Sequence, residues 1–172
     1  MNSFVSPAME AHATKCDLAA EVLRSSGRLR LQVTGSSMLP SVWPGDTLII
    51  DRLDRGDVSK GEIVLFGRDR RLFVHRVVKA AANGESTILT RGDAMPQPDL
   101  PVSTQSLLGK VSFIVRDGKL IEPGRNLSLT QKAVATMAGK SGIAARLIIG
   151  VRGKLQASSR RNASDRVVPC QS

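Results

Sequence analysis

The chain has 172 residues, of which 41% are hydrophobic and only 3% aromatic, and it contains no tyrosine. This length suits one domain with a core of its own, built mainly from Val, Ile, Leu and Ala. Because aromatic side chains are scarce, the composition argues against a surface that stacks single-stranded nucleic acid, and we predict no specific nucleic-acid partner.

The formal net charge of +10 is concentrated near the C-terminal end. Residues 1–122 contain 16 Lys and Arg against 14 Asp and Glu, whereas residues 123–172 contain nine against one. Basic segments of this kind are either solvated extensions or are attracted to anionic lipid or nucleic acid. A peripheral contact between this C-terminal segment and an anionic membrane is therefore one of two open interpretations.

Cys16 and Cys170 are the only cysteines, and they lie near opposite ends of the chain. Their spacing fits no zinc motif, so we expect two free thiols, no metal and no cofactor. The N-terminal residues lack the pattern of a signal peptide, and no apolar run reaches the ~18 residues of a membrane span. We therefore expect a cytoplasmic protein without a transmembrane segment.

The first predicted element in the chain is a short helix. Residues 1–16 show no regular pattern and are expected to form an irregular N-terminal segment. From Cys16 to Ser25 the apolar residues recur at helical spacing after a possible cap at Asp17, and the run stops at Gly27. The pattern predicts an amphipathic helix that opens a domain spanning residues 17–122.

Beyond the helix the hydrophobic period changes to two, which is typical of strands. The Asp-Gly pair at Asp117 and Gly118, between FIV and KLI, predicts a hairpin with a tight turn. Short strands at close spacing favour a mainly β fold, as an antiparallel meander or a small coiled barrel. The expected strands are RLRLQVTG at 28–35, TLIID at 47–51, EIVLF at 62–66 and LFVHRVV at 72–78.

The composition changes again after Pro123. Apolar residues at helical spacing between Leu129 and Ile149 predict an amphipathic helix within residues 123–151, although two glycines weaken the pattern. Residues 152–172 are expected to form a basic, disordered tail.

The segment GSSMLP, Gly35 to Pro40, places two serines after an expected strand, which by itself is ordinary turn composition. It is followed in order by PGD, GEIVLF, VHRVV, TRGD and LGKV. This series, within Leu29–Val111, resembles the serine peptidase superfamily that contains type I signal peptidases and the self-cleaving LexA-like repressors. The resemblance implies a small antiparallel coiled-barrel peptidase fold for about half of the chain.

The resemblance also implies roles for individual residues. The serine of the superfamily's SMxP box is the nucleophile, and it corresponds to Ser37. The base comes from a KRV or HRV box, which here contains His75, so the chain is most similar to the archaeal and endoplasmic-reticulum signal peptidases, which pair Ser with His. Histidine-type members carry an acidic residue six positions after the GD box, which is Asp99 here. Asp99 is therefore the first choice for orienting the histidine, and Asp93 of the GD box is the second.

The residue types suit this chemistry. A serine hydroxyl needs a neighbouring base to take its proton as it attacks a carbonyl carbon, and a neutral imidazole can be that base near physiological pH. Strand alternation places His75 on one face with Phe73 and Val77, among apolar neighbours. The alternative is a strand histidine bonded to a backbone partner. His12 lies in the expected irregular segment and is a poor candidate.

The developing oxyanion of such a reaction needs hydrogen-bond donors, and a tight turn could aim the backbone N–H of Ser37 at it. Many bacterial signal peptidases add a serine hydroxyl two positions before the nucleophile, where this chain has Gly35. The hydroxyls of Ser36 and Thr34 are the candidates to replace it.

The residues leave two functions open. The first is a serine endopeptidase of the signal-peptidase type that cleaves an extended peptide or protein substrate beside a strand edge, with small residues near the scissile bond by family analogy. The second is a non-catalytic, β-rich binding module that engages a partner or a membrane through its basic tail. The presence of Ser37, His75 and Asp99 together favours the peptidase.

Overall fold

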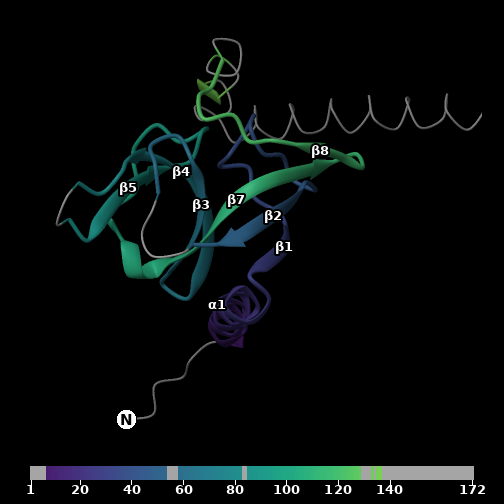
Figure 1. Cartoon of the computed structure of the whole chain (residues 1–172), viewed down its shortest axis with the longest axis vertical. Coiled ribbons are helices and arrows are strands. Elements are labelled where there is room, and N and C mark those ends of the chain that lie inside the picture. The colour runs from purple at the N-terminus through teal and green to yellow at the C-terminus, as the bar shows by residue number, and fades with distance from the viewer. Residues whose placement is uncertain (1–6, 54–57, 83–84, 129–132, 134, 137–172) are drawn as a thin grey trace, which may run out of the picture.

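The computed structural model describes residues 7–53, 58–82, 85–128, 133 and 135–136 of the chain (Figure 1). One helix precedes a succession of strands. Helix α1 spans Pro7–Ser26, and a short 3-10 helix, η1, spans Thr104–Ser106. The strands are β1 (Arg28–Gln32), β2 (Thr47–Arg52), β3 (Ile63–Arg68), β4 (Arg71–Lys79), β5 (Thr87–Arg91), β6 (Val102–Ser103), β7 (Leu107–Arg116) and β8 (Lys119–Ile121).

The strands form one sheet in the order β1-β2-β7-β3-β4-β5-β6, in which β8 pairs with the end of β7. Each of these described pairings is antiparallel, so the predicted mainly β, antiparallel fold is confirmed. Strand β7 pairs with β2 along one side and with β3 and then β8 along the other. Figure 1 shows the result, with β3, β4 and β5 on one side of β7 and β1 and β2 on the other.

The hairpin predicted at Asp-Gly joins β7 to β8. Asp117 and Gly118 have φ values of 52° and 74°, so both lie in the left-handed region. Two consecutive left-handed residues make the tight turn that Asp-Gly favours, because its twist matches that of the flanking strands. Arg116 and Lys119 are paired across this turn.

Helix α1 begins earlier than the sequence pattern predicts. Its first residue is Pro7, so residues 7–16, which were expected to be irregular, belong to the helix. Proline suits the first position of a helix, since the N–H that it lacks would have no intrahelical partner, and the Ala, Met and Glu residues that follow have high helix propensity. The predicted start is too late because the apolar period, on which the prediction rests, is regular only from Leu18 onward.

The core consists of two clusters on opposite faces of the sheet. Strand β3 is buried on both faces, and its alternating side chains serve both clusters. The first cluster, beneath α1, includes Leu23, Leu48, Ile50, Leu65 and Ile114. The second includes Val64, Phe66, Val77, Ile88 and Val102.

Most of the predicted C-terminal helix and all of the predicted basic tail lie outside the described residues, so a membrane contact through this segment stays a prediction. Within the part of the chain that the structure describes, no helix is both long enough and apolar enough to cross a bilayer.

Candidate active site

Ser37 lies in the loop of residues 33–46 that connects β1 to β2. The loop is closed at its base, because Val33 N–H donates to Asp46 O at 2.9 Å and Gly45 N–H donates to Val33 O at 2.8 Å. Three side chains of the loop, Met38, Leu39 and Val42, are at most 3% exposed. These buried groups anchor the loop in the core, whereas Ser37 itself is only half-buried.

His75 lies on β4 with its ring facing Ser37. The distance from His75 Nε2 to Ser37 Oγ is 3.2 Å, within hydrogen-bond range. The imidazole is almost fully buried and packs against Phe66 and Phe73, with ring centroids 6.1 and 6.0 Å away. The predicted apolar setting of His75 is therefore present, and the two phenyl rings restrict how the imidazole can turn.

Asp99 lies on the other side of the imidazole. Its Oδ2 is 2.7 Å from His75 Nδ1 and accepts a second hydrogen bond from Thr90 Oγ1 at 2.6 Å. An ionised carboxylate only accepts hydrogen bonds, so Nδ1 carries the proton and Nε2 of the neutral ring is free to accept. This tautomer lets the imidazole accept the Ser37 hydroxyl proton.

The loop that carries Asp99 is tied to its neighbours by the backbone. Asp99 N–H donates to Thr90 O at 2.8 Å, which folds the loop back onto the end of β5. At the start of the same loop, Ala94 N–H donates to Ser37 O at 2.9 Å. The loop therefore fixes the acidic residue and the serine at the same time.

Gly92 allows these segments to approach one another. A Cβ atom at this position would lie 2.7 Å from Ser37 O and 3.1 Å from His75 Nε2. The first distance is shorter than a van der Waals contact permits, so any side chain here would displace the serine or the histidine. The glycine of the TRGD segment is thus required by close packing.

Asp93 contacts Arg76 and not His75. Its two carboxylate oxygens accept hydrogen bonds from Arg76 Nε and Nη2, both at 2.8 Å, and Oδ2 also accepts from Ser41 Oγ. The Asp93 side chain is 3% exposed and the Arg76 side chain 9%. Ser41 belongs to the Ser37 loop and Arg76 follows His75 on β4. The buried ion pair, together with Ser41, therefore connects the Ser37 loop to β4.

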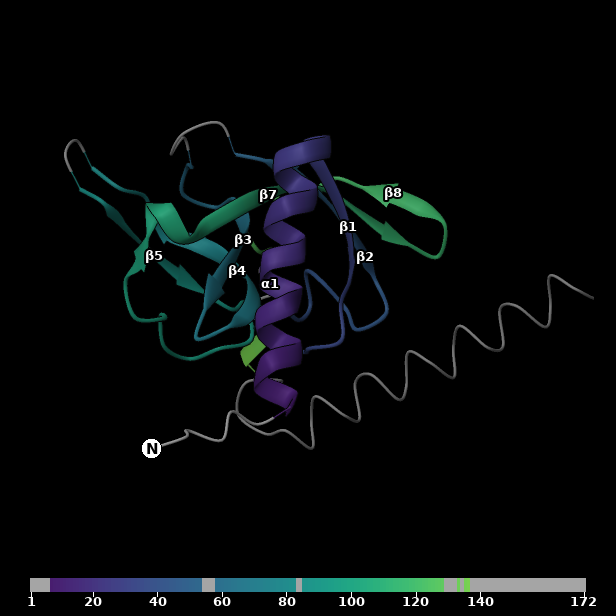
Figure 2. The same cartoon turned by 90° about the horizontal axis from the view of Figure 1, so that it is seen from below.

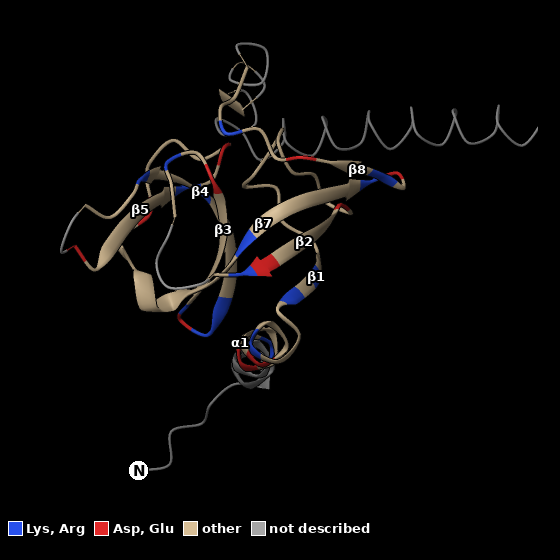
Figure 3. Ribbon diagram, in the orientation of Figure 1, with Lys and Arg blue, Asp and Glu red and all other residues tan. Residues whose placement is uncertain are grey.

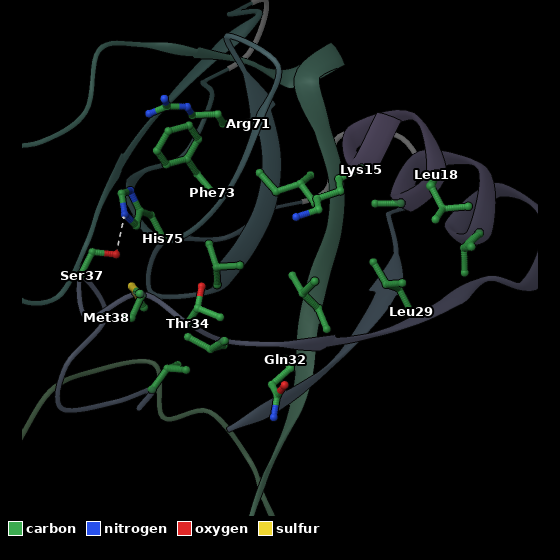
Figure 4. A pocket seen from close by; sticks show the side chains of 18 residues that line it. Lys15, Leu18, Leu29, Gln32, Thr34, Ser37, Met38, Arg71, Phe73 and His75 are labelled. Atoms are coloured by element: carbon green, nitrogen blue, oxygen red, sulfur yellow. Dashed lines mark hydrogen bonds between the residues drawn. The ribbon is translucent and has the colours of Figure 1, made fainter. Parts of the chain in front are cut away.

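An open cleft of about 960 Å³ begins at Ser37 and His75. Helix α1 forms one wall, and Figure 2 shows it lying between β4 on one side and β1 and β2 on the other. Apolar side chains from α1, β1, β4 and the Ser37 loop make up most of the lining, and Figure 4 shows Ser37 and His75 together at one end.

Two strand edges along this cleft have no partner strand among the described residues. Strand β1 pairs only with β2, and residues 71–75 of β4 pair only with β3. Both edges contribute to the lining of the cleft. Their unpaired N–H and C=O groups can hydrogen-bond to an added extended segment.

The predicted oxyanion donors are placed differently with respect to the cleft. The backbone N–H of Ser37 donates no hydrogen bond to any described residue. Thr34 lines the cleft, and Figure 4 shows its hydroxyl directed into it, whereas Ser36 is not among the lining residues. Of the two candidate hydroxyls, only that of Thr34 lies among the residues that line the cleft.

The sequence did not indicate Thr90, the Arg76–Asp93 pair with Ser41, or the position of α1 beside the cleft. Thr90 stands three residues before Asp93, which gives no sign that its hydroxyl reaches Asp99 across the loop. Among the described residues, no three His, Cys, Asp or Glu side chains gather closely enough to hold a metal ion.

The chain was compared with known families, curated proteins and solved structures. The model of the family described as Peptidase S24-like matches residues 4–112, more than half of the chain. Comparison with curated proteins and with solved structures gave no match. The matched range contains the Ser37 loop, β4 and Asp99, and it supports a serine peptidase-type function. The chain therefore belongs to the Peptidase S24-like family, within the superfamily of LexA and the signal peptidases.

Proposed function

We propose that the protein is a serine endopeptidase of the signal-peptidase type, with Ser37 as nucleophile, His75 as general base and Asp99 as the acid that orients the imidazole. The observation that carries the proposal is the continuous hydrogen-bond chain from Ser37 Oγ through both ring nitrogens to the Asp99 carboxylate. Among the alternatives for the base and the acid, only His75 and Asp99 take part in this chain.

The reaction follows from these positions. Ser37 Oγ attacks the scissile carbonyl carbon while its proton passes to His75 Nε2, and the resulting imidazolium is stabilised by the Asp99 carboxylate. The imidazolium then donates that proton to the leaving amine. In the second half of the reaction, His75 takes a proton from a water molecule as it attacks the acyl-serine, and returns that proton to Ser37 Oγ as the acyl group leaves. The Ser37 N–H and the Thr34 hydroxyl are the proposed donors to the oxyanion, and Ser36 is the alternative.

The substrate is an extended peptide that pairs with the free edges of β1 and β4. Main-chain hydrogen bonds to these edges supply affinity that does not depend on sequence, and the aliphatic lining selects apolar side chains. By analogy with signal peptidases, small residues are expected next to the scissile bond.

A mixed peptide library, analysed by mass spectrometry, tests this function. Wild-type protein should cleave a subset of peptides, and Ser37→Ala should cleave none of them above background. Ser112→Ala is a matched control, because its hydroxyl donates to Ile49 O between β7 and β2 and does not line the cleft. Equal cleavage by wild type and Ser37→Ala would refute the proposal, and no cleavage by the folded wild type would favour the non-catalytic binding module.

A further inference from the structure

The side chains that line the cleft carry net positive charge. Among its eighteen lining residues, Lys15 and Arg71 are basic and none is acidic. Neither Lys15 nor Arg71 forms an ion pair with a described residue. The proposed catalysis uses neither side chain, so their position needs a different explanation.

The two basic groups come from opposite walls of the cleft. Figure 4 shows the Lys15 side chain reaching from α1 into the cleft, and it shows Arg71 beside Phe73. Figure 3 shows basic positions together with an acidic one where β3 turns into β4, a strand that packs against α1. An extended peptide in the cleft would therefore pass between two cations while its apolar side chains cover the aliphatic lining.

We propose that the cleft selects peptides that combine aliphatic side chains with an acidic residue, and that Lys15 and Arg71 are the residues that recognise the acid. This inference rests on the proposed function, because it assigns a substrate class to the same cleft. Both side chains are exposed, so a peptide carboxylate would form a solvent-exposed ion pair of modest strength with each. A basic residue at the same place would be repelled by both.

The geometry of β4 predicts where the acidic residue lies. Arg71, Phe73 and His75 alternate along one face of the strand, and a rise of ~3.3 Å per residue places Arg71 about 13 Å from His75. A peptide paired with the free edge of β4 has a similar rise. Its acidic residue should therefore be most favourable about four positions from the scissile bond.

Binding to Ser37→Ala tests the inference without turnover. The probes are apolar peptides, acetylated and amidated so that only a side chain can supply a carboxylate, with Glu, Gln or Lys scanned along the sequence. We expect the best Glu peptide to bind roughly twofold to fivefold more tightly than its Gln counterpart for each exposed ion pair formed, and the Lys peptide to bind most weakly. The preference should shrink at high ionic strength, because salt screens exposed charges.

A charge-reversal variant tests the two residues directly. Lys15→Glu combined with Arg71→Glu, in the Ser37→Ala background, should invert the order so that the Lys peptide binds more tightly than the Glu peptide. Lys60→Glu combined with Lys119→Glu changes the net charge equally at exposed positions that neither line the cleft nor lie on β1 or β4, and it should keep the original order.

Three outcomes would overturn the inference: equal binding of Glu, Gln and Lys peptides, no binding of any peptide, or the same inversion in the control variant. Failure of the proposed function is a separate result. It would appear as no cleavage of these peptides by the folded wild type, whereas the Glu preference in binding would remain.

Discussion

Two acidic residues lie near His75, and changing each to asparagine is predicted to have a different effect: one variant should lose stability and the other should lose catalytic activity. Asp93 and Asp99 lie six positions apart, and both carboxylates accept hydrogen bonds from side chains of β4. Asp93 is paired with a buried arginine, whereas Asp99 holds the imidazole. The substitution keeps the shape of the side chain but removes its charge and replaces one acceptor oxygen with an NH2 donor.

The cost of Asp93→Asn should appear in stability. The variant leaves the Arg76 guanidinium, which is 9% exposed, without its counter-ion. Breaking a buried ion pair on one side costs about 3 to 5 kcal/mol in the free energy of unfolding. Urea unfolding should show this loss, and the activity of the fraction that remains folded should change much less.

The cost of Asp99→Asn should appear in catalysis. The Asn amide can donate to His75 Nδ1, which moves the ring proton to Nε2 and removes the acceptor for the Ser37 hydroxyl proton. In a serine triad the wrong tautomer lowers kcat on the order of 10⁴-fold, and we expect a loss of that order with a change in unfolding free energy of about 1 kcal/mol or less.

Peptide cleavage and urea unfolding of both variants, with Asp69→Asn on the exposed β3–β4 turn as control, measure the two effects. The assignment would be refuted if Asp93→Asn lowered kcat/KM at unchanged stability, or if Asp99→Asn kept its activity.

Three further predictions concern the surroundings of the site. Thr90→Val removes one hydrogen bond to Asp99, so kcat/KM should fall about fivefold to tenfold with little change in KM; an unchanged kcat would contradict this. Gly92→Ala should lower both activity and the free energy of unfolding, the latter by about 1 to 3 kcal/mol, because the new Cβ meets Ser37 O at 2.7 Å. Full activity would contradict this, because it would show that the loops accommodate the added methyl group without displacing Ser37. The hydrogen bond from Arg28 holds the pKa of Asp51 below its ordinary value, so this pair stabilises the fold above the unfolded-state pKa of Asp51 and is lost as pH falls through the folded-state pKa; Asp51→Asn should therefore be slightly less stable than wild type at neutral pH and equal to it in acid, as measured by thermal unfolding.

Several strands were predictable because their pattern is local, whereas β5 and β6 were not predicted. Alternation along residues 28–32 and 72–78, and the Asp-Gly turn at 117–118, depend on period and turn chemistry that a short window of sequence contains. The start of α1 was not predictable from the same period, since helix propensity and the proline at position 7 determine it.

The family resemblance ranked Asp99 ahead of Asp93 by its spacing, but the contacts of the two carboxylates could not be predicted from that spacing. These contacts depend on how the loop after Gly92 folds back to bring Asp99 N–H to Thr90 O, and on the burial of Arg76 beside Asp93. Both are long-range packing results. The position of α1 beside the cleft also results from long-range packing. An amphipathic pattern shows which face of a helix is buried but not which residues that face covers.

The reactivity of the Ser37 hydroxyl is the central claim, and covalent labelling tests it without knowledge of the substrate. The protein is treated with a small fluorophosphonate that modifies activated serines, and the modified residue is mapped by mass spectrometry. We predict labelling at Ser37 in the wild type, and its loss in a folded His75→Ala variant. An unmodified Ser37 in the wild type, or equal labelling in both proteins, would contradict activation of the serine by His75.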